Sequence, residues 1–331
     1  MRSYGSDVAV FGAGITVGSD RNLYVTGSHL ETLPEGAGIP GSSAVVASID
    51  PSGSLRWSRR VTTTRPSVAF AVAVTADRVL IGGAMSRPDG RCPGRPMAFA
   101  AMFDTKGNEL WQRVLRHPSG GPSITTAVAF APSGTPLVTG RGGQTCDSVS
   151  TPQNGGRGFI IRLDAAGEVL SRKQPARLID VAGVAIQSGV IYLLGVRDVR
   201  LPAFEGVADV VVRLGAEDDV RWVRFLRGPR RTNAGAIAAG PVGGVVVAGS
   251  TDELPPPIIR GNDDAVAIGL AEGGAILWRW EMPDSPGYSH VTGIGAYNGD
   301  VIIGGIATGN VHGARPTRRG SAWVARLAVP R

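Results

Sequence analysis

The stretch Leu-Tyr-Val-Thr-Gly27 decides the fold, because a segment of the same kind returns five more times along the chain. Each copy is a run of mostly aliphatic or β-branched residues that ends in glycine. The further copies are Val-Leu-Ile-Gly-Gly83, Pro-Leu-Val-Thr-Gly140, Ile-Tyr-Leu-Leu-Gly195, Val-Val-Val-Ala-Gly249 and Val-Ile-Ile-Gly-Gly305. Successive terminal glycines are 56, 57, 55, 54 and 56 residues apart. A fixed period of this length indicates a repeat architecture.

Each copy has the pattern of four strands, which we call A, B, C and D in chain order. Small residues such as Gly14 and Ala71 mark strand A, the glycine-ended run is strand B, and a second apolar run, first seen as Ala-Val-Val-Ala-Ser-Ile-Asp50, is strand C. Strand D begins near a tryptophan in four of the six copies, at Trp57, Trp111, Trp222 and Trp278, and Ser171 takes this place in the third copy. Small innermost residues and bulky outer ones suit blades that widen with radius.

The sequence therefore predicts an all-β, six-bladed β-propeller with four antiparallel strands per blade, spanning residues 1–331 as a single domain. The last copy ends after strand C. We expect residues 2–6 to pair with residues 322–328 and so to supply strand D of the last blade, because closure of this kind removes two free sheet edges.

Between strands C and D of the first three copies lie Asp-Pro-Ser-Gly53, Asp-Thr-Lys-Gly107 and Asp-Ala-Ala-Gly167. An aspartate that bonds its own backbone, followed by a glycine with positive φ, is typical of a tight turn. The fourth copy has Asp218 where the others have glycine, and aspartate tolerates this conformation.

The segment from Val-Thr-Gly27 through Ala-Val-Val-Ala to Asp-Pro-Ser-Gly-Ser-Leu-Arg-Trp57 resembles the bacterial SBBP-type β-propeller repeats. The resemblance covers the whole chain and is most specific in the first three copies. In copies four to six the turn aspartate is lost, and six copies differ from the seven blades in that family's name. The resemblance implies an exported or envelope-associated protein, and it carries over no catalytic residue because that family shares none.

A sialidase Asp-box is a near-match that the spacing excludes. That motif reads Ser-x-Asp-x-Gly-x-x-Trp. The segment Ser48-Ile-Asp50-Pro-Ser-Gly53-Ser-Leu-Arg-Trp57 has one extra residue before the glycine and one more before the tryptophan.

The B–C and D–A connections are long and varied, whereas the A–B and C–D connections are short. In an antiparallel meander the two long sets lie on one face, which we call the long-loop face. Because function concentrates on variable loops held by a rigid scaffold, this is the expected binding face.

All four histidines map to the long-loop face. His29, His290 and His312 belong to the adjoining first and sixth blades, and Tyr288 and Arg315 lie near them in the sequence, which makes these five residues the candidate ligand site. The alternative interpretation is that polar residues simply favour loops. His117 precedes strand A of the third blade. The spacing identifies no catalytic residue, no metal site and no cofactor.

Cys92 and Cys146 fall in neighbouring B–C loops. In a chain that resembles exported proteins this placement predicts one disulfide, and two unpaired thiols are the alternative.

The net charge of +7 comes from 32 arginines, that is 34 basic residues less Lys106 and Lys173, against 27 acids. Much of the excess lies on outer strands, where charge commonly blocks edge-to-edge pairing. A nucleic-acid groove would need basic residues gathered with stacking aromatics, and the loops offer Phe204 and Tyr288, so nucleic acid is disfavoured as a partner.

Neither a signal peptide nor 18 consecutive apolar residues is visible, so the chain is expected not to span a membrane and to be either cytoplasmic or a mature domain of a longer exported protein. We expect a monomeric, non-enzymatic binding or scaffold module of an exported or envelope-associated bacterial protein, with a protein or glycan partner on the long-loop face. The alternative is an enzyme on the same face, such as a six-bladed glycosidase or a quinone- or metal-dependent dehydrogenase, which would need His29, His290 and His312 to reach one pocket together with carboxylates.

Overall fold

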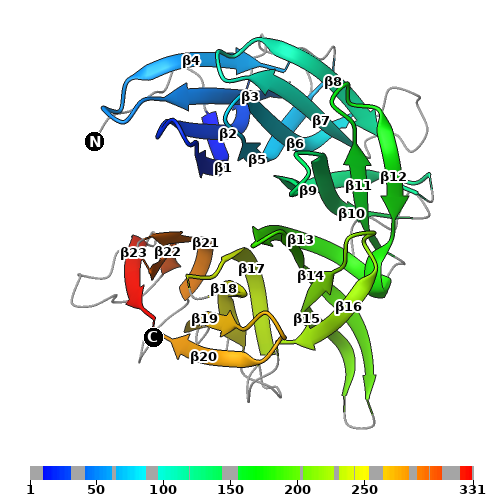
Figure 1. The fold of residues 1–331 in the computed structure, drawn as a ribbon, viewed down its shortest axis with the longest axis vertical. Coiled ribbons are helices and arrows are strands. Elements are labelled where there is room, and N and C mark those ends of the chain that lie inside the picture. Colours follow the sequence, from blue (N-terminus) through cyan, green and yellow to red (C-terminus); the bar gives the residue numbers. More distant parts are fainter. Residues whose placement is uncertain are drawn as a thin grey trace, which may run out of the picture. The chain divides into compact units, whose positions relative to one another are not determined.

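A computed structural model describes residues 10–30, 42–61, 65–86, 96–118, 120–143, 156–201, 204–226, 231–241, 243–252, 264–282, 289–297, 299–307 and 321–329. In these ranges the chain is all β, apart from one short 3₁₀ turn at Pro175–Arg177. Contacts divide the chain into two compact units: residues 1–174 with 179–181, and residues 175–178 with 182–331. Each unit holds three antiparallel sheets (Figure 1). The six sheets are the blades that the repeat predicts, and the fold class is a six-bladed β-propeller.

The first unit contains three four-stranded sheets whose order in space follows their order in the sequence. Their strands are β1 (Val10–Val17), β2 (Leu23–Leu30), β3 (Ser42–Ile49) and β4 (Leu55–Arg60); β5 (Ser67–Val74), β6 (Arg78–Ser86), β7 (Pro96–Asp104) and β8 (Glu109–Leu115); and β9 (Ser123–Phe130), β10 (Pro136–Gly142), β11 (Arg157–Leu163) and β12 (Val169–Lys173). The first strands lie side by side, β5 next to both β1 and β9.

The second unit contains two four-stranded sheets and one sheet of three described strands. Their strands are β13 (Leu178–Gln187), β14 (Val190–Leu201), β15 (Phe204–Leu214) and β16 (Val220–Phe225); β17 (Arg231–Ala239), β18 (Val245–Asp252), β19 (Asp264–Leu270) and β20 (Ile276–Glu281); and β21 (Ser289–Tyr297), β22 (Asp300–Ala307) and β23 (Ser321–Ala328). The predicted closing strand, residues 2–6, lies outside the described residues, so closure stays a prediction. The prediction of a single domain also remains open.

Two irregularities recur at fixed places in the sheets. Strand A shifts register beside the strand-B glycine in the first, second, third, fifth and sixth sheets. Strand D shifts register just before the tryptophan position in the first five sheets. The first shift explains the glycine: a Cβ atom on Gly83 would overlap the carbonyl oxygen of Val68 on the bulged strand.

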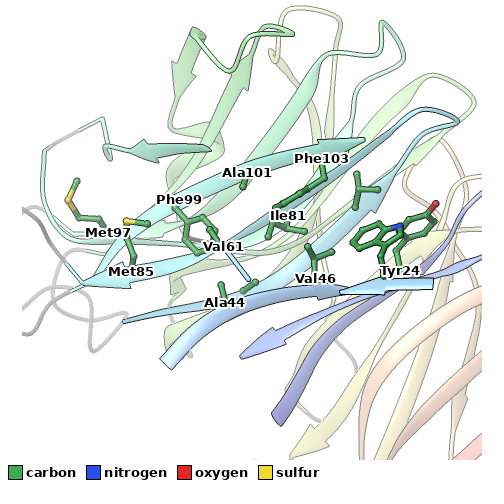
Figure 2. Packing of buried hydrophobic residues seen from close by; sticks show 13 residues of the cluster. Tyr24, Ala44, Val46, Val61, Ile81, Met85, Met97, Phe99, Ala101 and Phe103 are labelled. Atoms are coloured by element: carbon green, nitrogen blue, oxygen red, sulfur yellow. The ribbon is translucent and has the colours of Figure 1, made fainter. Parts of the chain in front are cut away.

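The hydrophobic core is divided into layers between neighbouring sheets. Between the first two sheets, Ala44, Val46 and Trp57 pack against Ile81, Phe99 and Phe103 (Figure 2). A similar layer lies between the second and third sheets, and two more lie within the second unit. Because strands B and C contribute side chains to the layers on both of their faces, they read as continuous apolar runs rather than as alternating ones.

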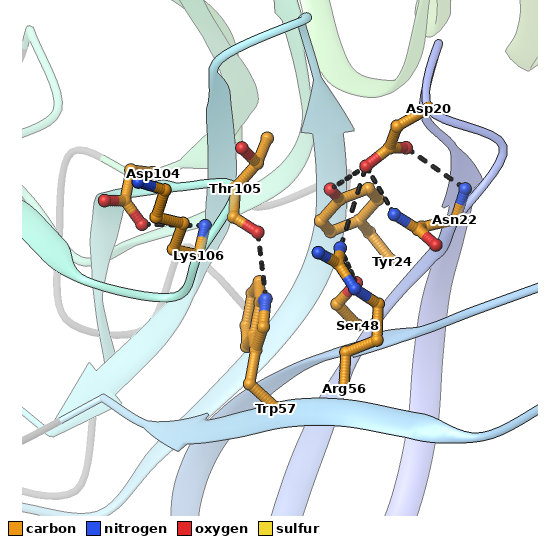
Figure 3. Close-up of polar contacts among 9 residues, drawn as sticks. All are labelled: Asp20, Asn22, Tyr24, Ser48, Arg56, Trp57, Asp104, Thr105 and Lys106. Atoms are coloured by element: carbon orange, nitrogen blue, oxygen red, sulfur yellow. Dashed lines mark hydrogen bonds and ion pairs between the residues drawn. The ribbon is translucent and has the colours of Figure 1, made fainter.

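The tryptophans of strand D hold neighbouring blades together. Trp57 Nε1 donates a hydrogen bond to the Thr105 carbonyl in the next blade's C–D turn, at 3.0 Å (Figure 3). Trp111 bonds the Ala165 carbonyl at 2.9 Å and Trp222 bonds the Glu272 carbonyl at 3.1 Å, so the contact repeats in both units. The indole also packs on the turn glycine, because a Cβ atom on Gly107 would lie 2.8 Å from the Trp57 ring. We call this hydrogen bond and ring contact the indole–turn contact.

Arginines of the outer strands reinforce the indole–turn contact. Arg59 Nε donates to the Gly107 carbonyl at 2.9 Å, and Arg113 Nη2 donates to the Ala166 carbonyl at 2.9 Å. Arg113 also pairs with Glu168 at 3.0 Å. At these two positions the basic side chains join blades, and the expected protection of an open sheet edge stays a prediction.

The fourth blade does not have the long, irregular B–C loop that the sequence predicts. Strands β14 and β15 pair without interruption from Ile191 with Leu214 to Leu201 with Phe204, and only two residues separate them. Phe204, expected in a loop, therefore belongs to strand β15. The connection runs on as a two-stranded ribbon because β-branched residues continue past Gly195 at Val196, Val199 and Val207.

Candidate functional site

His29 is buried at the end of β2 and contacts Arg60 of β4. Arg60 Nη2 lies 3.0 Å from His29 Nε2. Because a guanidinium group can only donate, Nε2 accepts this bond and the ring proton lies on Nδ1. His29 is 8 % exposed, and its Nδ1 is buried without a hydrogen-bond partner. The candidate residue is thus a buried histidine whose Nε2 is already bonded to Arg60.

His290 lies at the start of β21, half-buried, with Nδ1 3.3 Å from Ser250 Oγ on β18. It belongs to the second compact unit and His29 to the first. Each therefore makes its polar contact within its own unit. Tyr288, His312 and Arg315 lie outside the described residues, as do Cys92 and Cys146. The five-residue ligand site and the disulfide stay predictions.

An ion pair that the sequence pattern did not single out links β10 to β13. Arg141 Nη1 lies 3.0 Å from Asp180 Oδ2, and both residues fall in the first unit. Burial raises the pKa of Asp180, although the charge of Arg141 acts in the opposite direction. Asp180 Oδ1 is buried without a hydrogen-bond partner. The two residues lie 39 positions apart in the sequence, so no local pattern marks the pair.

A cavity of about 200 Å³ opens on the long-loop face of the first unit. It lies where strands of the first two sheets start or end on this face. Its lining residues are Ser42, Pro66, Ser67, Val68, Ala84, Met85, Ser86 and Pro96. None of these is charged. The Ser67 hydroxyl accepts a hydrogen bond from the Ala44 backbone N–H at 3.0 Å, which ties the floor of the cavity to β3.

The cavity lies on the face that the sequence analysis expects to bind a partner, but the sequence analysis names none of its lining residues. The wall consists of small residues at strand ends, and no motif marks them. The prolines at positions 66 and 96, each at or next to a strand start, were the available signal.

Among the described residues, no group of three or more histidine, cysteine, aspartate or glutamate side chains is arranged to hold a metal ion. The same residues contain no helix with the length and apolar character needed to cross a bilayer.

No family model and no curated protein matches the chain. Among solved structures, it is similar to the WD40 domain of Pan2 from Neurospora crassa, with 9 % identity, 97 % of this chain and 90 % of that chain covered, and a TM-score of 0.50. It is similar to a luciferin-regenerating enzyme at 12 % identity, with 96 % and 91 % coverage and a TM-score of 0.50. It is similar to a sialidase from Trypanosoma rangeli at 11 % identity, with 97 % and 54 % coverage and a TM-score of 0.50. At these identities the likeness shows the fold alone.

Proposed function

We propose that the protein is a non-enzymatic binding or scaffold propeller that holds its partner on the long-loop face. The observation that carries this proposal is the uncharged cavity at the seam of the first two blades. Its lining residues lie in or next to strands β3, β5, β6 and β7, and the central residues of these strands are buried in a common core layer. A concave site on rigid strands suits recognition, because little ordering is needed when a partner enters.

The chemistry of the cavity favours a protein partner over a glycan. Proline, valine, alanine and methionine provide most of the lining, and three serine hydroxyls complete it. Among the described residues of the lining there is no aromatic ring on which a sugar could stack and no charged side chain. A volume of about 200 Å³ suits one prolyl or aliphatic side chain. The ligand is therefore an extended polypeptide segment that places one uncharged apolar side chain in the cavity.

The proposed setting is the cell envelope or the exterior of a bacterium. Support comes from the resemblance of the first three copies to SBBP-type repeats, and the disulfide predicted on that basis between Cys92 and Cys146 agrees with such a setting. A disulfide in these two B–C loops would staple neighbouring parts of the binding face, and it would persist only outside a reducing cytoplasm.

A peptide array tests the proposal. Purified full-length protein is applied to immobilised Gly/Ser-flanked peptides with a central proline, leucine, valine, lysine or glutamate, and to a glycan array in parallel. We expect retention on the proline and aliphatic peptides. Ala84→Phe fills the cavity and should weaken this retention by at least about tenfold, which corresponds to about 1.4 kcal/mol.

Ala166→Phe is the matched control, because Ala166 is exposed in the turn between β11 and β12, on the opposite face of the same unit. It should bind as the wild type does. Retention on glycans with none on peptides, or equal peptide binding by the wild type and Ala84→Phe, would contradict the proposal.

A further inference from the structure

His117 is the most completely buried histidine among the described residues, and it anchors the connection between β8 and β9 on the long-loop face. It is 2 % exposed. Its Nε2 lies 3.2 Å from the Arg157 carbonyl, an acceptor, so Nε2 carries the proton and donates. Its ring meets the Phe159 ring edge-on, with centroids 5.6 Å apart. One side chain thus ties this connection to the start of β11.

The third blade makes room for this ring in a way that the second blade does not. Gly142 at the end of β10 occupies the place that Met85 has at the end of β6, as the pairing of both with the serine at the start of strand A shows. A Cβ atom on Gly142 would lie 2.5 Å from His117 Cδ2. The space that a side chain fills in one blade is therefore filled in the next by a histidine from the preceding connection.

The same connection is held by backbone bonds on either side of the ring. The Gly120 N–H donates to the His117 carbonyl at 2.8 Å, and the Gly143 N–H donates to the Pro122 carbonyl at 3.0 Å. These two amides report whether the connection is docked. If the His117 ring leaves its place over Gly142, no packed side chain shields either hydrogen bond from water.

The surroundings of the ring favour its neutral form. Burial lowers the pKa of His117 from its ordinary value of 6.5, and the charge of Arg157 lowers it further, although the bond to the Arg157 carbonyl acts in the opposite direction. Strands β9, β10 and β11 contain no acidic residue. Among the described residues, Arg116 is next in the chain, and Arg141 precedes Gly142 on β10 and pairs with Asp180. The charge that acts against protonation of the ring is that of Arg157.

We propose that His117 is a pH-sensitive latch, which holds the β8–β9 connection against β11 when its ring is neutral and releases it when the ring is protonated. Protonation adds a proton at Nδ1 and places a charge in a buried site lined by Phe159. The released connection hydrates the charge. Acid therefore changes the shape of the long-loop face without unfolding the sheets. This inference is independent of the apolar cavity, which lies at the other seam of the first unit.

The direction of the pH dependence follows from the lowered pKa. The released ring titrates near 6.5, and the docked ring titrates below that value. Docking is strongest above about pH 6.5. Between that pH and the docked pKa it weakens by up to about tenfold per pH unit, because release takes up one proton, and below the docked pKa it weakens no further.

Hydrogen exchange measured by NMR tests the latch. Protection factors of the Gly120 and Gly143 amides are followed from about pH 7.5 to about pH 5, with strand amides of β10 and β11 as the reference. We expect protection at both glycines to fall once the pH drops below about 6.5, by up to about tenfold per pH unit, while the reference amides keep theirs. In His117→Gln, which keeps a donor but cannot be charged in this range, protection should not depend on pH. His29→Gln is the control and should behave as the wild type.

Gly142→Ala provides a second variant, because it removes the space for the ring without touching a titratable group. It should lower the protection of both amides at every pH. The ring signals of His117 in the wild type provide a measurement that needs no variant. Constant protection down to pH 5, an equal fall in His117→Gln, or a ring that titrates at or above 6.5 would overturn the proposal.

Discussion

The C–D turns of the first three blades and those of the fourth and fifth reach the same backbone geometry from different sequences. In the first three, an aspartate carboxylate caps the turn: Asp104 Oδ1 accepts from the Lys106 N–H at 2.9 Å and from the Asn108 N–H at 2.8 Å, and Asp50 and Asp164 do the same. The fourth and fifth blades have Gly215 and Ala271 instead. The backbone N–H groups of these two residues still donate to the Asp219 and Ala275 carbonyls, both at 2.8 Å.

The comparison separates what the turn requires from what merely supports it. The carboxylate is dispensable. A residue with positive φ at the fourth position is present in all five turns, as Gly53, Gly107, Gly167, Asp218 and Gly274. Where the structure gives an indole–turn contact, that fourth residue is glycine. The exception, Asp218, follows the third copy, which has Ser171 in place of tryptophan. At Gly107, Gly167 and Gly274 the indole therefore adds a second reason for glycine to the positive φ that the turn requires.

The largest effect should come from the indoles themselves. Trp57 is 8 % exposed, whereas Trp222 is half-buried, although each makes the same hydrogen bond. Trp57→Ala should lower the free energy of unfolding by about 3–5 kcal/mol, and Trp222→Ala by less, because less apolar surface leaves the core. Urea unfolding of both variants checks this. Equal losses, or a larger loss at Trp222, would show that burial does not set the strength of the contact.

A smaller effect should follow from a methyl group on the turn glycine. Gly107 has φ of +87° and touches Trp57, whereas Gly134 has φ of +78° and only an arginine tip at 3.9 Å from its would-be Cβ atom. Gly134→Ala should lower the free energy of unfolding by about 1–2 kcal/mol, from backbone strain alone. Gly107→Ala should cost about 1–3 kcal/mol more, because the indole must move. Thermal unfolding of the pair measures the difference, and its absence would remove the indole from the explanation.

The smallest effect should come from the capping carboxylates. Asp104 is partly buried, and Asp104→Ala should lower the free energy of unfolding by about 0.5–1.5 kcal/mol, whereas Ala271→Asp should raise it by a few tenths. Burial by itself raises the pKa of Asp104, but the bonds from Asn108 and Lys106 outweigh it and the pKa is lowered. The contribution is therefore present above the ordinary value of 3.8 and is lost as the pH falls through the lowered pKa. The two variants should converge with the wild type in acid, and a cost that persists there would not come from the carboxylate.

The repeat made most of the fold predictable. The glycine spacing located the blades, and the tryptophan was expected in the wedge between blades, where Trp57 and Trp111 lie. The register shifts of strands A and D were not predicted, because a bulge leaves no fixed residue type in the sequence. The extended ribbon of β14 and β15 was not predicted either, because Val196, Val199 and Val207 lie in what the sequence presents as a variable connection.

The candidate site was less predictable, for a physical reason. His29 and Arg60 lie 31 residues apart and meet only because strands B and D bring them to one end of the sheet. The cavity is made of backbone ends and small side chains from two blades, which no spacing rule marks. His117 was identified as a loop residue, but its burial depends on Gly142, a position whose role appears only when the blades are stacked.

The claim that six copies of one repeat build the whole chain is tested most directly at the sixth sheet. Five sheets have four strands, whereas in the described residues the sixth has β21, β22 and β23. Hydrogen exchange of the backbone amides of residues 2–6 in the intact protein is the measurement. The account predicts that alternate amides of this segment are protected as strongly as those of β23, because they pair with residues 322–328. Exchange of residues 2–6 at the rate of an unstructured peptide would contradict it.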